Sequence, residues 1–219
     1  KGTSAGVGAF NNVRNSWVGL QHANYGTLTL GRQNSVANEW TPKGFASDVS
    51  VYYPSNTIQE SFLTMYSSDR VNNAIKYQSP NWNGFETRAF YGFGEVVGTT
   101  AIPGDTSDAA RYGIGGAYKN GPLDLALVYQ GVAKDDTKPV DGSVNAWFLG
   151  GSYDFNVVKV FAAYQVESNK QLGADSDKDL WTLGARVPVG KAGTVVFEYL
   201  DYKNDTNNLL ENQRAKGWG

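Results

Sequence analysis

Segments in which apolar and polar residues alternate at every second position recur along most of the chain. In the segment from Leu123 to Gln130, the odd positions are all leucine or tyrosine, whereas the even positions include Asp124 and Gln130. A period of two residues is that of a β-strand whose two faces meet different surroundings. The same pattern predicts further strands over 85–95, 111–119, 144–154, 157–167 and 180–187. Segments of about 8–11 residues have the length that a tilted strand needs to cross a bilayer.

The connections between these segments are alternately short and long. Short ones carry turn residues, as in Asn120-Gly121-Pro122 and Pro188-Val189-Gly190. Longer polar connections cover 33–70, 96–110, 133–143, 168–179 and 203–213. This alternation is typical of an up-and-down barrel that has short turns at one rim and long loops at the other. The sequence therefore predicts an all-β fold, an antiparallel up-and-down transmembrane β-barrel, with about ten strands in a single domain over residues 1–219.

The connection over 33–70 is much longer than the others. Its flanking strands are separated by about 37 residues, against the usual 2–5 of a hairpin loop. A loop of this length in a tightly turned β-protein is usually functional. We expect it to fold inward and to narrow a pore. Its acidic residues, Glu39, Asp48 and Glu60, are candidates for the acidic side of that constriction.

Aromatic residues fall into two groups along the predicted strands. One group lies at the short turns and consists of Tyr25, Trp82, Phe85, Tyr118, Tyr153 and Phe155. The other lies towards the opposite strand ends and consists of Tyr91, Phe93, Tyr129, Tyr164, Tyr199 and Tyr202. Two such bands are expected of aromatic girdles at the two membrane interfaces. The alternative is aromatic packing at the two ends of a soluble β-sandwich.

Composition argues against several other classes of function. The net charge is −2, which gives no reason to expect binding to nucleic-acid phosphates. There is no cysteine, and His22 is the only histidine, so neither a zinc nor a copper site is indicated. No hydrolase elbow, phosphate loop or dinucleotide fingerprint is present, and we expect neither an enzyme nor a cofactor. Acidic pairs such as Asp135-Asp136 could bind calcium, but solvated loops explain them as well.

Several blocks of sequence carry a resemblance to a known family. They are Ser16-Trp17-Val18-Gly19-Leu20, Tyr25 to Gln33, Asp69 to Tyr77 and Ser79 to Phe85. In order and spacing these blocks resemble the general porins of Gram-negative outer membranes, in the β-proteobacterial and neisserial branch. The likeness is looser after Arg111 but extends over nearly the whole chain.

The resemblance implies a homotrimer of 16-stranded barrels, each a water-filled pore with its third external loop folded inside. The ten strands would then be the fourth to the thirteenth, and the chain would be part of a longer protein. Ala215-Lys216-Gly217-Trp218-Gly219 reads as the start of another strand. A complete ten-stranded barrel is the alternative, since even strand numbers are allowed.

Basic residues are expected on the pore wall. The resemblance matches Arg14 and Arg70 to wall arginines of the family, one before the first turn and one at the exit of the long loop. Strict alternation places Arg70 on the side of Lys76, facing the lumen, whereas Arg14 needs a bulge to do so. Alternation alone also points Arg88, Arg111, Lys159 and Arg186 inward, and Arg32 towards lipid. A charge on the lipid face costs about 2–4 kcal/mol at the midplane, which favours the lumen for strand arginines and lysines.

These observations predict an outer-membrane porin for passive diffusion of small hydrophilic solutes and ions, with an anion preference. Its expected partners are two further copies of itself, outer-membrane lipid, lipopolysaccharide and the permeating ions. Two alternatives remain: a soluble β-sandwich that binds carbohydrate through exposed Trp and Tyr, and a barrel whose loop plugs the lumen.

Overall fold

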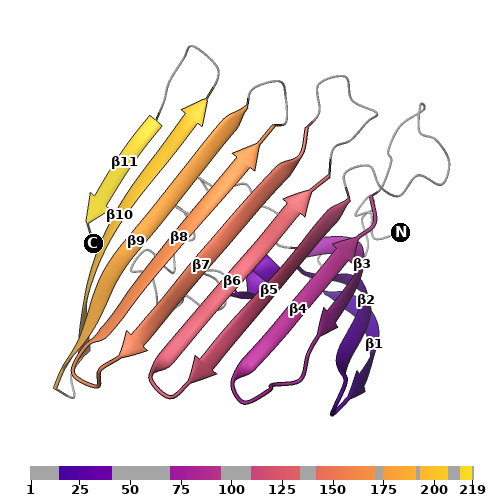
Figure 1. Cartoon of the computed structure of the whole chain (residues 1–219), viewed down its shortest axis with the longest axis horizontal. Helices are drawn as coiled ribbons and strands as arrows, with labels where there is room; N and C mark the ends of the chain where they lie inside the picture. The colour runs from indigo at the N-terminus through magenta and orange to yellow at the C-terminus, as the bar shows by residue number, and fades with distance from the viewer. Residues whose placement is uncertain are drawn as a thin grey trace, which may run out of the picture.

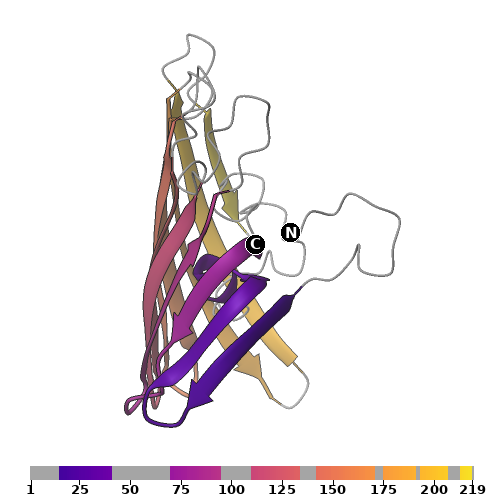
Figure 2. The ribbon, with the colours of Figure 1, turned by 90° about the vertical axis from the view of Figure 1, so that its right-hand side faces the viewer.

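The chain forms one curved antiparallel sheet (Figures 1 and 2). The computed structural model describes residues 15–40, 70–94, 110–133, 142–170, 175–190, 193–206 and 213–218. In these residues eleven strands follow one another in chain order, each hydrogen-bonded to the next. Among the described helices, none is long and apolar enough to cross a membrane.

The strand bounds are β1 (Ser16–His22), β2 (Gly26–Asn34), β3 (Arg70–Gln78), β4 (Phe85–Gly92), β5 (Arg111–Asn120), β6 (Leu123–Val132), β7 (Val144–Asp154), β8 (Lys159–Asn169), β9 (Ser176–Val189), β10 (Gly193–Thr206) and β11 (Gln213–Trp218). The up-and-down order confirms the predicted topology, and a single sheet takes the place of the two packed sheets of a sandwich. The eleventh strand, β11, contains the segment from Ala215 that we expected to start a further strand beyond the ten. Strands β9 and β10 also extend into the predicted long connections.

Tight turns close one rim of the sheet. At the turn between β3 and β4, Asn83 and Gly84 both have positive φ angles, of 52° and 97°. Two such residues in succession match the right-handed twist of the adjoining strands. A Cβ atom on Gly84 would lie 2.2 Å from the carbonyl oxygen of Lys119, so the neighbouring strand also requires glycine there.

Alternation assigns each strand residue to one of two faces. In β7, Trp147 and Leu149 are exposed, whereas Ala146 and Phe148 are buried. We call the exposed, convex side the outer face and the concave side the inner face (Figure 2). Phe161 has the same parity in β8 as the polar Lys159 and Glu167; it lies on the inner face and is 1% exposed.

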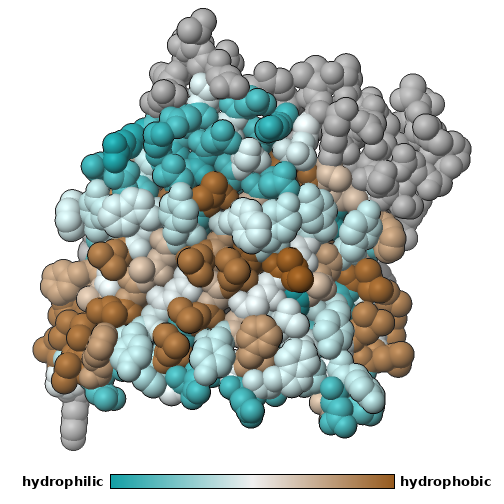
Figure 3. Space-filling view, viewed as in Figure 1, coloured by the Kyte–Doolittle hydropathy of each residue, from teal (hydrophilic) through white to brown (hydrophobic). Residues whose placement is uncertain are grey.

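The outer face carries an apolar band between two rows of aromatic rings. Figure 3 shows this brown band across the face, with hydrophilic residues gathered above it. In the upper row, the ring centroids of Trp181 and Tyr199 are 5.0 Å apart, and those of Tyr199 and Trp218 are 4.4 Å apart. In the row at the short turns, those of Tyr153 and Phe155 are 4.5 Å apart. Girdles flanking an apolar band are the surface expected of a membrane-spanning barrel.

One predicted member of the upper girdle lies elsewhere. Tyr202 is 2% exposed and pairs with Leu180, which is buried on the inner face. Tyr199 and Tyr202 are three residues apart in one strand, so their side chains point to opposite faces. Tyr202 is therefore not a girdle residue.

A bulge interrupts the alternation near the start of β3. Val71 and Ala74 are both buried in the core although they are three positions apart. Asn73 lies between them with a φ of 48°, and two residues of β3 lie opposite Arg32 of β2. An extra residue in one strand of a pair shifts the side chains beyond it to the other face.

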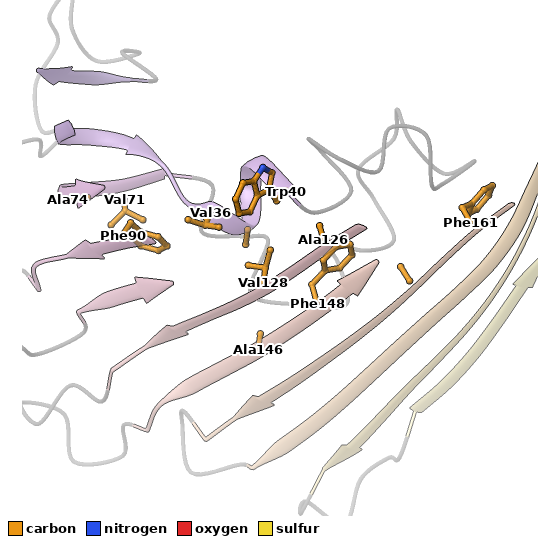
Figure 4. Close-up of a cluster of buried hydrophobic side chains, with 12 residues drawn as sticks. Val36, Trp40, Val71, Ala74, Phe90, Ala126, Val128, Ala146, Phe148 and Phe161 are labelled. Atoms are coloured by element: carbon orange, nitrogen blue, oxygen red, sulfur yellow. The ribbon is translucent and has the colours of Figure 1, made fainter. Parts of the chain in front are cut away.

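The inner face holds the main cluster of buried apolar side chains. A short helix, α1 (Val36–Trp40), follows β2 and lies on this face (Figures 1 and 2). Its Val36 and Trp40 pack in one cluster with Val128 and Phe148 of the wall (Figure 4). The start of the long connection therefore folds inward over the sheet.

Candidate pore constriction

Helix α1 begins and packs for local reasons. Ser35 precedes it and accepts a hydrogen bond from the backbone N–H of Asn38 at 3.1 Å, as a helix N-cap does. Val36, Ala37 and Trp40 are buried and share one side of the helix by their spacing. Glu39 precedes Trp40 and is not one of these buried residues. Its side chain instead reaches charged residues of the wall.

Glu39 joins two basic residues of neighbouring strands. Its Oε1 lies 2.7 Å from Nζ of Lys76 in β3, and its Oε2 lies 3.0 Å from a guanidinium nitrogen of Arg88 in β4. Lys76 Nζ also donates to the backbone carbonyl of Asn34 at 3.2 Å. One carboxylate thus ties the start of the connection to the wall at two points.

Arg88 has two further partners. Glu86, two residues earlier on the same face, lies 3.5 Å from its second guanidinium nitrogen. The guanidinium carbon lies 4.6 Å from the ring centroid of Trp40, which is a cation–π arrangement. Arginine suits such a position because its planar group pairs and stacks at once and stays charged.

We call Glu39, Lys76, Glu86 and Arg88 the charge cluster. The side chains of Lys76, Arg88 and Glu39 are 11%, 17% and 22% exposed. Charges so shielded from solvent interact more strongly than the same charges on an open surface. The cluster places an acid on α1 in direct contact with two bases on the wall, so these charges gather at one place on the inner face.

Comparison with known proteins assigns the chain to a family. The model of a family described as "Gram-negative porin" matches residues 2–219. The chain belongs to the Gram-negative porin family. An outer membrane porin protein of Bordetella pertussis is 30% identical over 192 residues, which are 84% of this chain and 49% of the relative. The chain thus spans about half the length of that curated relative.

Two solved structures of outer-membrane proteins share the fold. The anion-selective porin from Comamonas acidovorans has a TM-score of 0.62 and 24% identity, over 94% of this chain and 65% of the other. The trimer form of OmpT, an outer membrane protein of Vibrio cholerae, has a TM-score of 0.64 and 15% identity, over 93% and 62%. At these identities the likeness is one of fold.

Of the porin residues that we predicted for the constriction, the structure brings three together. Glu39, Lys76 and Arg88 meet in the charge cluster. Arg111 lies on the inner face, in alternation with the buried Gly113 of β5, but forms no ion pair with another described residue. Its place near the cluster stays a prediction. Arg14, Asp48 and Glu60 lie outside the described residues.

Arg70 is affected by the bulge at Asn73. Arg70 pairs with Asn34 of β2 and directly precedes Val71. Val71 faces inward. Alternation from Val71 therefore puts Arg70 out of phase with Lys76, whereas the sequence placed both on one side. That Arg70 lines the lumen stays a prediction, no longer supported by strict alternation. Arg32, expected towards lipid, donates to the side-chain oxygen of Asn72 at the same bulge.

Sequence reasoning missed several parts of the porin wall. Neither Gly115 nor Gln130 had a predicted role, yet both contact α1: Gly115 lies against Trp40, and Gln130 accepts a hydrogen bond from the backbone N–H of Ala37. Lys178 of β9 lies in a predicted loop but forms an ion pair of 3.2 Å with Glu167 on the inner face. The sequence offered no apolar/polar alternation as a signal here, because residues 176–179 are all polar. Among the described residues, no group of three or more His, Cys, Asp or Glu could hold a metal ion.

Proposed function

We propose that the protein forms a water-filled pore in the outer membrane and passes small hydrophilic solutes and ions by passive diffusion. Family membership and the girdled outer face support a barrel in a membrane. The proposal makes residues 1–219 part of one barrel domain, with 33–70 as its constriction loop. It gives the chain a channel role and no catalytic one.

The observation that carries the proposal is the bridge from Glu39 to Lys76 and Arg88. It ties the start of the 33–70 connection to the inner wall, where this segment narrows the passage. A barrel surface serving only as a scaffold has no need of opposed charges on its concave side. A narrow point limits the size of a passing ion, and the charges at that point exert an electric field on it.

An anion preference is the second part of the proposal. The wall strands β3 to β5 carry Lys76, Arg88 and Arg111 on the inner face, against Glu86. Lysine and arginine lining a pore favour anions. The Comamonas porin of the same fold is described as anion-selective. Arg14 and Arg70 would add to the basic side.

We also propose a homotrimer in contact with outer-membrane lipid and lipopolysaccharide. The girdles and the apolar band between them support the contact with lipid. A trimer form is known for OmpT of Vibrio cholerae, which shares the fold.

Conductance across a planar bilayer with a salt gradient tests the proposal. We expect stepwise openings of the purified native protein, closing in groups of three, and a reversal potential whose sign shows preference for the anion. Silence from a folded, detergent-extracted sample would indicate a plugged barrel instead. A protein that needed no detergent for extraction would contradict the membrane location altogether.

A further inference from the structure

We infer that Gly115 and Gln130 are positioning residues of the constriction, which seat α1 on the wall and thereby hold Glu39 between Lys76 and Arg88. We call these two residues the seat. The inference rests on the proposed pore function and adds to it the residues that set the position of the acidic group. Neither residue touches the permeating ion in this scheme; both act through Glu39.

Gly115 provides the space that α1 fills. A Cβ atom on Gly115 would lie 2.8 Å from Cε3 of Trp40 and 3.0 Å from Cγ1 of Val36. Real Cβ atoms essentially never approach another heavy atom within 3.0 Å, so with a side chain there the ring of Trp40 must shift. The φ angle of Gly115 is not in the positive range, and its backbone therefore does not require glycine. The contact with α1 alone explains the residue.

Gln130 fixes α1 from the next strand. Its side-chain oxygen accepts a hydrogen bond from the backbone N–H of Ala37 at 3.2 Å. Gln130 is 5% exposed, and Ala37 is fully buried. A first-turn N–H of a helix has no partner within the helix and must find one elsewhere. The glutamine supplies it, and so fixes α1 at its first turn while Gly115 accommodates its last residue.

The seat is directly connected to the charge cluster. Gly115 is the cross-strand partner of Arg88, whose guanidinium lies over the ring of Trp40. Glu39 precedes Trp40 in the same short helix. A side chain at position 115 that moves Trp40 therefore also withdraws Glu39 from its two bases. Lys76 then faces the passage without Glu39, Arg88 keeps only Glu86, and the pore becomes more selective for anions.

The test measures the reversal potential of the whole protein in its native assembly, with Gly115→Ala, Gly115→Val and Gln130→Leu as variants. We expect each to shift the reversal potential towards the anion, the valine more than the alanine. Gly116→Ala is the matched control: the next residue faces outward, and a Cβ atom there lies 3.4 Å from its nearest neighbour, Phe85. We expect no shift for this control.

A second background separates positioning from general loosening. In protein that carries Glu39→Gln, Gly115→Ala should cause no further shift, because the group through which it acts is already neutral. An undiminished shift in that background would overturn the inference, as would unchanged reversal potentials in all three seat variants. If Gly115→Val does not fold, Gly115→Ala and Gln130→Leu still decide. Absence of any conductance from the parent protein would refute the proposed pore function, not the seat.

Discussion

The carboxylate of Glu39 lies 3.0 Å from the guanidinium of Arg88, although the two residues are 49 positions apart in the chain. The contact joins a short helix to the barrel wall, and the same carboxylate also reaches Lys76, so that one negative charge is shared by two bases. The charge that a permeating ion meets therefore depends on whether this acid is in place.

Glu39→Gln should increase the preference for anions. A unit charge about 5 Å from the ion path contributes about 0.8 kcal/mol at the dielectric constant of water, favourable for one sign of ion and unfavourable for the other. This is about a fourfold change for each ion, or about 16-fold in the ratio of anion to cation permeability before screening by salt. The measurement is the reversal potential in a salt gradient. Asp205→Asn is the control, since this exposed acid of β10 pairs with Lys203 outside the cluster and should leave the potential unchanged. Equal shifts from both variants would indicate a general surface-charge effect.

Arg88→Gln should lower the preference for anions by a similar factor, because a wall charge is lost beside the passage. Arg88→Lys keeps the charge but loses the planar contacts with Glu86 and Trp40. We expect its reversal potential to stay near that of the parent, with a loss of about 0.5–2 kcal/mol in the free energy of unfolding, measured by urea titration in lipid vesicles. If the lysine and glutamine variants gave the same potential, charge at this position would not control selectivity.

Phe148→Ala should destabilise the folded protein by about 3–5 kcal/mol, because it leaves a cavity beneath α1. Phe148 is fully buried in the inner cluster. Leu149→Ala, the next residue in the same strand, faces outward, where lipid chains can fill the space. We expect a smaller loss from it in the same urea titration. The reverse order would mean that the inner cluster contributes little to stability.

Leu149→Arg should cost about 2–4 kcal/mol if position 149 lies in the hydrocarbon region. It lies between Trp147, whose ring centroid is 4.5 Å from that of Tyr129 in the upper girdle, and Tyr153 of the other girdle. Asp205→Arg, on the same face but beyond Tyr199 of the upper girdle, should cost about 0–1 kcal/mol because a charge near the interface stays hydrated. Unfolding titrations in vesicles measure both. Similar values for the two would place the outer face in water.

Much of the fold could be predicted because strand alternation is a local property. The spacing of Leu149, Trp147 and Tyr153 assigns one face of β7 with no knowledge of its neighbours, and the same reasoning brings Lys76 and Arg88 to the inner face. The errors occur where alternation fails or was not followed. Asn73 inserts one residue and reverses the phase of Arg70, and Tyr202 was grouped with Tyr199 by proximity along the chain instead of by face.

The charge cluster could be predicted only in part. Glu39 was one of three acids in a long connection, and nothing near it in sequence distinguishes it from Asp48 or Glu60. What selects Glu39 is the place where α1 lies, and that place depends on Gly115 and Gln130, more than 75 residues further along the chain. Neither residue has a chemistry that marks it as functional by itself.

The sequence by itself determined the class of fold, the order of the strands and the face to which most of their residues belong, because these follow from a period of two residues and from turn chemistry. The tertiary structure decided which acid meets which base. Contacts between α1 and strands β3 to β6 depend on sheet curvature, on the bulge at Asn73 and on the space left at Gly115. These are relationships between distant segments, which exist only when the chain is folded.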